Sequence, residues 1–114
     1  MPKRSIAHTS LPPRVQDHLQ SLGNNIRLAR KRREYSQEHL AGMAYVTRDT
    51  IRRLESGHPG VSLGVLVTVL WVLQLDESLS VVGHPDHDRL GLALDRKRLP
   101  ERVRMKDKGD DYDF

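Results

Sequence analysis

The sequence predicts an all-α fold, a bundle of about five helices with a flexible N-terminal arm and a charged C-terminal tail. Apolar side chains recur at helical spacing between residues 12 and 33, and residues 36–57 read as two short helices joined by a tight turn. The stretch 62–75 is a further helix, apolar almost all round but too short to span a membrane. We therefore expect an arm at 1–11, one compact domain at 12–83 and a tail at 84–114.

Chain length and residue types limit the class of protein. With 114 residues and no cysteine, the chain has room for one small domain, and it has neither a disulfide framework nor a thiolate metal site. The first ten residues lack the apolar stretch of a secretory signal. We expect a soluble cytoplasmic protein without a membrane segment or a cofactor.

The first helix begins near Pro12 and Pro13, because proline suits a first helical turn. Its apolar positions share a spacing of three or four residues up to Arg33: Val15, Leu19, Leu22, Ile26 and Ala29. Gly23-Asn24-Asn25 weakens this helix midway. The pattern leaves open one bent helix or two shorter ones.

The stretch 36–57 has the spacing of a helix-turn-helix. Ser36 and Thr47 each precede a helical pattern and can accept a hydrogen bond from a free N–H of the first turn. The turn between the two helices is about three residues long. Gly57 supplies the left-handed residue that ends the second helix. The inward positions of the two helices are Leu40, Ala41, Ala44, Ile51 and Leu54.

These residues resemble the helix-turn-helix pattern of the phage-repressor-like (XRE, lambda and 434 repressor) family. The matching positions are Gln37, Leu40, Ala41, Val46, Thr47, Thr50, Ile51, Leu54, Glu55 and Gly57, and the fit extends back through Ile26, Arg27 and Arg30. The resemblance implies a lambda-repressor-like bundle that reads DNA. Glu34 and Tyr45 stand where this family usually has glycine. Because tyrosine at a positive φ is strained, we expect the turn to differ locally from that of the family.

In such a fold the second helix lies in the major groove, with its N-terminal outer residues at the base edges. Arg48, Asp49 and Arg53 are therefore the base-reading candidates. Arginine can donate two parallel hydrogen bonds to guanine, whereas Asp49 can accept from a cytosine amino group or orient a neighbouring arginine. Thr47 and Arg52 are candidates for phosphate contacts.

Two further roles are implied by the resemblance. Gln37, at the start of the first helix of the motif, is expected to contact the DNA backbone and support the base contacts. Glu55 is expected to pair with Arg30 and hold the second helix against the preceding one. This pair is structural, although it positions the DNA contacts.

The net charge of +4 is unevenly distributed. Residues 1–35 carry +6, residues 36–75 are neutral and residues 76–114 carry −2. A basic segment before a helix-turn-helix is typical of a protein that binds phosphates, because each neutralised phosphate releases counterions. Next to this motif, we interpret the run 30–33 as part of that basic surface.

The helix expected at 62–75 must be buried on several faces because it is apolar on several faces. One face can pack on the helix-turn-helix, and another is expected to meet a second copy of the chain. The residues expected at this homodimer interface are Val65, Val69, Trp71 and Val72. The alternative, in which one subunit covers all these faces, stays open.

In the tail, the sequence predicts a weak helix at residues 86–98, followed by an end at residues 101–114 that is mobile unless bound. A small dimeric DNA reader with such a tail resembles the antitoxins of bacterial toxin–antitoxin operons, particularly the HipB type, which implies autoregulation and a HipA-type toxin kinase as partner. Candidate partner-docking residues are Arg96, Arg98, Tyr112 and Phe114. A free-standing repressor and an RNA-binding or protein-interaction module are the alternatives. His84 and His87 match no strong metal-ligand spacing, and no catalytic constellation is evident, so we expect no enzyme.

Overall fold

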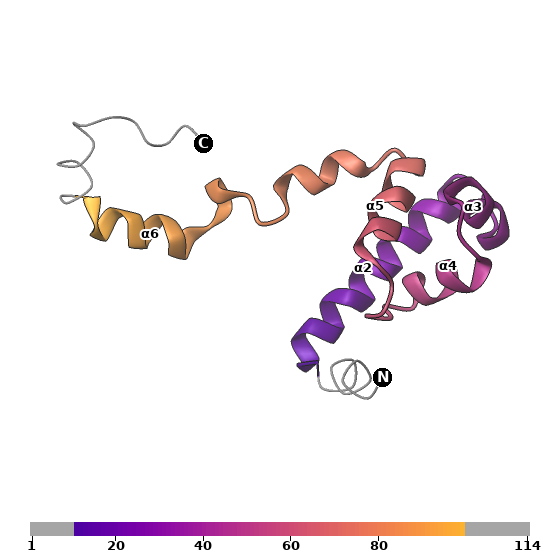
Figure 1. The fold of residues 1–114 in the computed structure, drawn as a ribbon, viewed down its shortest axis with the longest axis horizontal. Helices are drawn as coiled ribbons and strands as arrows, with labels where there is room; N and C mark the ends of the chain where they lie inside the picture. Colours follow the sequence, from indigo (N-terminus) through magenta and orange to yellow (C-terminus); the bar gives the residue numbers. More distant parts are fainter. Residues whose placement is uncertain (1–10, 100–114) are drawn as a thin grey trace. The chain divides into compact units, whose positions relative to one another are not determined.

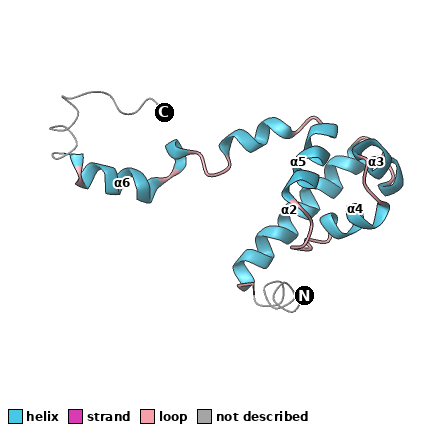
Figure 2. Cartoon of the chain, viewed as in Figure 1, coloured by secondary structure: helices cyan, strands magenta, loops and turns pink. Residues whose placement is uncertain are grey.

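The computed structural model describes residues 11–99. Its elements are α2 (Pro13–Arg32), α3 (Gln37–Ala44), α4 (Arg48–Glu55), α5 (Leu63–Val72), the 3-10 helices η1 (Asp76–Val81) and η2 (Pro85–His87), and α6 (Arg89–Lys97) (Figure 1). No strand occurs in the described part of the chain (Figure 2). The predicted all-α fold is confirmed. Most of the arm predicted at 1–11, and the end predicted to be mobile at 101–114, lie outside the described residues.

The chain divides into two units between Glu77 and Ser78. This break lies earlier than the domain end expected at Gly83, and η1, which crosses it, contributes no buried residue.

In the second unit, α6 starts at Arg89 because the carboxylate of Asp88 caps it, accepting a hydrogen bond from the Gly91 N–H at 2.9 Å. The helix expected at 86–98 is therefore shorter, and a 3-10 turn precedes it.

One continuous helix of 20 residues forms α2, which answers the question left open by Gly23. Gly23 is buried against the end of α4. A Cβ atom at this position would lie 2.5 Å from the carbonyl oxygen of Glu55 and 2.7 Å from that of Leu54. The glycine that weakens α2 locally is thus required for α2 to lie against α4.

The predicted start signals are confirmed. The Ser36 hydroxyl accepts a hydrogen bond from the His39 N–H at 2.9 Å, and the Thr47 hydroxyl accepts one from the Thr50 N–H at 3.1 Å. Ser62 does the same for α5. Each hydroxyl satisfies a backbone donor that the first turn leaves without a partner, and this fixes where each helix begins.

Helices α2, α3, α4 and α5 all end in the same way. A residue with positive φ follows each: Glu34 (60°), Tyr45 (58°), Gly57 (81°) and Gln74 (62°). Two backbone hydrogen bonds close each end; after α3 these are Tyr45 N–H to Gly42 O at 3.3 Å and Val46 N–H to Ala41 O at 3.0 Å. This is the Schellman arrangement, which satisfies carbonyls at the helix end. Tyr45 therefore keeps the left-handed backbone that glycine would favour, and the local departure expected there is not found.

The core of the first unit is made by α2, α3, α4 and α5. Helix α4 contacts both α2 and α3, and α5 packs against α3 (Figure 1). The buried apolar residues are Ile26, Ala29, Leu40, Ala41, Ala44, Ile51, Leu54, Val69, Leu70 and Leu73. Val69, which the sequence assigned to a dimer interface, is completely buried within its own subunit. That assignment is wrong, because such a side chain has no surface to offer to a second copy.

Candidate nucleic-acid interface

The outer face of α4 carries the charged residues that the sequence singled out. Ile51 and Leu54 are buried, whereas Arg48, Asp49 and Arg52 are exposed and Arg53 is half-buried. With 3.6 residues per turn, the two apolar positions fall on one side of α4 and the charged positions on the other. The helix therefore presents a row of guanidinium groups to solvent while its apolar side anchors it.

Asp49 and Arg52 form an exposed ion pair on this face. Arg52 Nε donates to Asp49 Oδ1 at 3.1 Å, and Nη2 donates to the same oxygen. This hydrogen bond is the main reason that the pKa of Asp49 lies below its ordinary value of 3.8, and the charges of Arg52, Arg53 and His58 act in the same direction. Two roles were expected for Asp49. In the absence of DNA its carboxylate orients an arginine, Arg52.

Behind α4 lies a buried network that fixes the helix. Arg30 Nε and Nη2 donate to the two carboxylate oxygens of Glu55 at 2.6 and 3.0 Å, and Nη1 donates to the Tyr35 carbonyl at 2.9 Å. The two residues are 7% and 5% exposed. The expected pair between Arg30 and Glu55 is thus present, in the bidentate form that a guanidinium favours.

Gln37 belongs to the same network. Its side-chain amide donates to Glu55 Oε1 at 3.0 Å, so the carboxylate accepts three hydrogen bonds and none of its buried polar atoms lacks a partner. Gln37 was expected to contact the DNA backbone and to support the base contacts. The structure places its side chain where it joins the start of α3 to the end of α4.

The basic run at residues 30–33 is split between the interior and the surface. Arg30 is buried, and Arg33 donates to the carbonyls of Ala29 and Leu73 at 2.8 and 2.7 Å. Only Lys31 and Arg32 are exposed. The interpretation of the whole run as a basic surface therefore needs correction. Arg33 holds the end of α5 against α2, a role that no local sequence signal indicates, since its acceptor is 40 residues away.

Thr47 stands at the N-terminus of α4. Its hydroxyl caps the helix and lies 2.9 Å from the hydroxyl of Thr50. The residue is exposed, as is Arg48 beside it. A hydroxyl and free backbone N–H groups at a helix N-terminus suit a phosphate contact.

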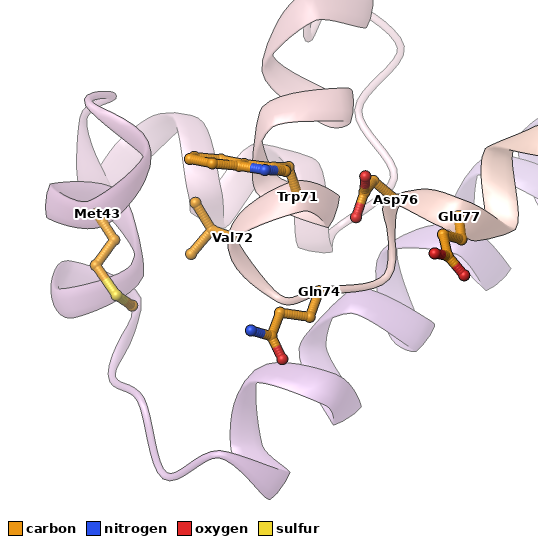
Figure 3. Close-up of a pocket in the computed structure, with 6 residues that line it drawn as sticks. All are labelled: Met43, Trp71, Val72, Gln74, Asp76 and Glu77. Atoms are coloured by element: carbon orange, nitrogen blue, oxygen red, sulfur yellow. The ribbon is translucent and has the colours of Figure 1, made fainter.

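A groove borders α5 on the side of α3. It has a volume of about 610 Å³ and is lined by Met43, Trp71, Val72, Gln74, Asp76 and Glu77. Figure 3 shows the ring of Trp71 and the side chain of Val72 directed towards Met43, with the two carboxylates on the other side. Trp71 is 64% exposed, and Val72 and Val65 are half-buried. Three of the four residues assigned to a dimer interface thus keep exposed apolar surface.

The remaining candidates lie in the tail. Arg96 and Arg98 are exposed at the end of α6, whereas Tyr112 and Phe114 lie outside the described residues. Within residues 11–99, no cluster of three or more His, Cys, Asp or Glu side chains could hold a metal ion. No helix among them is long and apolar enough to cross a membrane.

Comparison with known proteins gives one match. The model of the helix-turn-helix family matches residues 26–78, which include α3, α4, α5 and the end of α2. No curated protein and no solved structure matched the chain. The match covers Arg30, Glu55 and every candidate on α4. Residues 26–78 are therefore a helix-turn-helix domain of the phage-repressor-like (XRE) family, the DNA-binding domain of a transcription regulator.

Proposed function

We propose that the protein is a sequence-specific repressor, which acts in the cytoplasm and binds a palindromic operator as a homodimer. One observation carries the proposal: the charged outer face of α4, held in place by the buried pair of Arg30 and Glu55. A helix fixed in this way can enter the major groove without rearrangement, so little of the binding free energy is lost to ordering.

Within α4, Arg48 and Arg53 are the base readers. Each can donate two parallel hydrogen bonds to O6 and N7 of a guanine, which discriminates against the wrong base by about 1–3 kcal/mol. Thr47 and Arg52 contact phosphates on either side, and Gln37 adds a backbone contact while it supports Glu55. Asp49 keeps Arg52 in position or accepts from a cytosine amino group.

The homodimer forms through the exposed surface of α5. Trp71 and Val72, with Val65, supply apolar surface that is unusual on a monomer. Two-fold symmetry would then place the two copies of α4 about 34 Å apart, so the half-sites are centred about ten base pairs apart.

Trp71 is the only tryptophan of the chain, which makes the dimer testable. On dilution we expect its fluorescence to shift to the red as the mass measured by sedimentation falls from dimer to monomer. Trp71→Ser should give a monomer at all concentrations, whereas Val82→Ser, which removes exposed apolar surface outside the groove, should leave the dimer intact. A chain that sediments as a monomer with native Trp71 would refute this part.

Sequence reading is tested by selection of bound duplexes from a random pool. We expect the native chain to enrich a palindrome, and Arg48→Ala and Arg53→Ala to lose preference at defined positions. Arg14→Ala removes the same charge from an exposed position on α2 and serves as control. Comparable affinity for palindromic duplex, random duplex and RNA at fixed salt would instead favour a module that does not read operators.

A narrower version of this function is the autoregulating antitoxin of a toxin–antitoxin operon, with a HipA-type toxin kinase as partner. The observation that favours it is α6, where Leu90, Leu92 and Leu94 are 70, 43 and 40% exposed beside the basic Arg96 and Arg98. Aromatic Tyr112 and Phe114 would add anchors to this docking segment. Deletion of residues 100–114 should release the toxin but leave operator affinity unchanged. Unchanged toxin retention would remove the docking role from this end, and a free-standing repressor would have no such partner.

A further inference from the structure

A polar cleft of about 300 Å³ lies between α2 and α4. One wall is a row of α2 side chains one helical turn apart, Gln20, Asn24 and Arg27. Arg52 of α4 and Ser56, which follows α4, form the other wall. Gly23 makes the two helices approach closely, since a Cβ atom there would overlap the Glu55 and Leu54 carbonyls. The cleft is therefore a fixed feature of the packing.

The side chains that line the cleft are mostly hydrogen-bond donors. Arg27 is exposed and makes no ion pair within residues 11–99. Arg52 uses Nε and Nη2 on Asp49, which leaves Nη1 to donate elsewhere. Gln20 donates to Asn24 Oδ1 at 3.2 Å, so the acceptor of Asn24 is used while its N–H groups remain. Such a set of donors matches an acceptor-rich anion.

Among residues 11–99, Glu55 is the one carboxylate that lines the cleft, and it does not oppose an anion. Glu55 is 5% exposed, and its two oxygens accept hydrogen bonds from Arg30 and Gln37. Its charge is balanced inside the network by the guanidinium of Arg30. With this pair neutral, Arg27 gives the cleft a positive field.

The cleft is continuous with the outer face of α4, because Arg52 belongs to both. Its other wall comes largely from outside the helix-turn-helix match, which begins at residue 26, whereas Gln20 and Asn24 lie before it. The N-terminal part of α2 therefore adds donors beside the recognition helix.

We propose that this cleft binds one phosphodiester group of duplex DNA, with Arg27 as the main charge and Asn24 and Arg52 as further donors. The proposal rests on the proposed function, because the duplex must lie along α4. Bound there, the phosphate fixes how α2 sits on the backbone without contributing to sequence preference. It extends the DNA contact surface beyond α4 and its N-terminus.

The test uses the full chain and a random-sequence duplex, with affinity measured from about 50 to 200 mM salt. Arg27→Gln is compared with Arg14→Gln, which removes the same charge from an exposed position on the same helix. Asn24→Asp is compared with Asn25→Asp in the same way, since Asn25 is exposed but does not line the cleft. Thermal midpoints of all four variants verify folding.

Loss of one phosphate contact should make the negative slope of log affinity against log salt shallower by about 0.9, which is a loss of about eightfold in affinity at 0.1 M salt. We expect this of Arg27→Gln but not of Arg14→Gln, and we expect Asn24→Asp to weaken binding more than Asn25→Asp. Equal effects within each pair would overturn the proposal. So would inorganic phosphate that shifts the Asn24 amide resonances where duplex DNA does not, because the ligand would then be a free anion.

Failure of this proposal can be distinguished from failure of the proposed function. If a palindrome is enriched from the random pool while Arg27→Gln behaves like Arg14→Gln, the cleft assignment fails and operator reading stands. If no sequence is enriched but the salt slope still depends on Arg27, the cleft binds phosphate and the repressor function fails.

Discussion

Removal of the Glu55 carboxylate should destabilise the domain before it alters DNA recognition. In the native protein Glu55 accepts three hydrogen bonds, two from Arg30 and one from Gln37. Glu55→Ala leaves the Arg30 guanidinium, 7% exposed, with only the Tyr35 carbonyl as partner. A buried charge without its counterion is one of the costliest single changes in a small domain.

The size of the effect follows from the burial of the pair. Breaking a buried ion pair from one side costs about 3–5 kcal/mol, whereas an exposed pair contributes about 0–1 kcal/mol. A domain of this size has about 5–15 kcal/mol of stability in total. Glu55→Ala should therefore remove about a fifth or more of the free energy of unfolding.

Urea unfolding at fixed protein concentration, followed by circular dichroism and by Trp71 fluorescence, measures this loss. The control is the double variant Arg30→Met with Glu55→Leu, which removes both charges and keeps apolar volume. It should be more stable than Glu55→Ala, because no unpaired charge stays buried. A loss below about 1 kcal/mol would show that the pair behaves like a solvated one. An unchanged thermal midpoint with abolished DNA binding would show that Glu55 acts at the DNA and not in the fold.

Three further outcomes are expected. Gly23→Ala should cost about 1–3 kcal/mol by overpacking, because its Cβ would lie 2.5 Å from the Glu55 carbonyl oxygen. Gly42→Ala, whose Cβ would have open space around it, should instead stabilise α3 by about 0.5–1 kcal/mol. Equal changes in the urea midpoint of the two variants would contradict the packing of α2 on α4. Tyr45→Gly should raise the free energy of unfolding by about 0.5–1 kcal/mol, because the φ of Tyr45 is 58° and its side chain is 94% exposed. A decrease in the free energy of unfolding would mean that the ring makes a stabilising contact. The ion pair of Asp49 and Arg52 should persist at neutral pH and be lost only as pH falls through the lowered pKa of Asp49, below 3.8. An NMR titration in which Arg52→Gln leaves the pKa of Asp49 unchanged would refute Arg52 as the main cause of the lowered pKa.

Helix starts and ends could be predicted because their determinants are local. Ser36 and Thr47 lie within three residues of the N–H groups that they accept from, so sequence spacing alone identifies them. Tyr45 shows the limit of this reasoning. Strain at a positive φ predicted a changed turn, but the two hydrogen bonds that close α3 outweigh the strain of a single residue.

Contacts between distant segments could not be predicted from pattern. Gly23 reads as a weak point within α2, and only the approach of the α4 carbonyls gives it a role. Val69 reads as one of several apolar residues on a helix that is apolar almost all round. Where a helix has no polar face, periodicity does not say which side is inside, so the assignment of Val69 to a dimer interface failed.

The arginines of the first unit show why charge counts alone overstate a DNA-binding surface. Arg30 balances Glu55 in the interior and Arg33 holds the carbonyl that ends α5, so two cations of a basic run act within the fold. Arg27, by contrast, stands outside that run and lines an open cleft. A phosphate responds only to a charge that it can reach, because salt screens exposed charges beyond about 10 Å. The position of each arginine on α2, and not the charge of +6 over residues 1–35, therefore determines which of them contribute to the salt dependence of DNA binding.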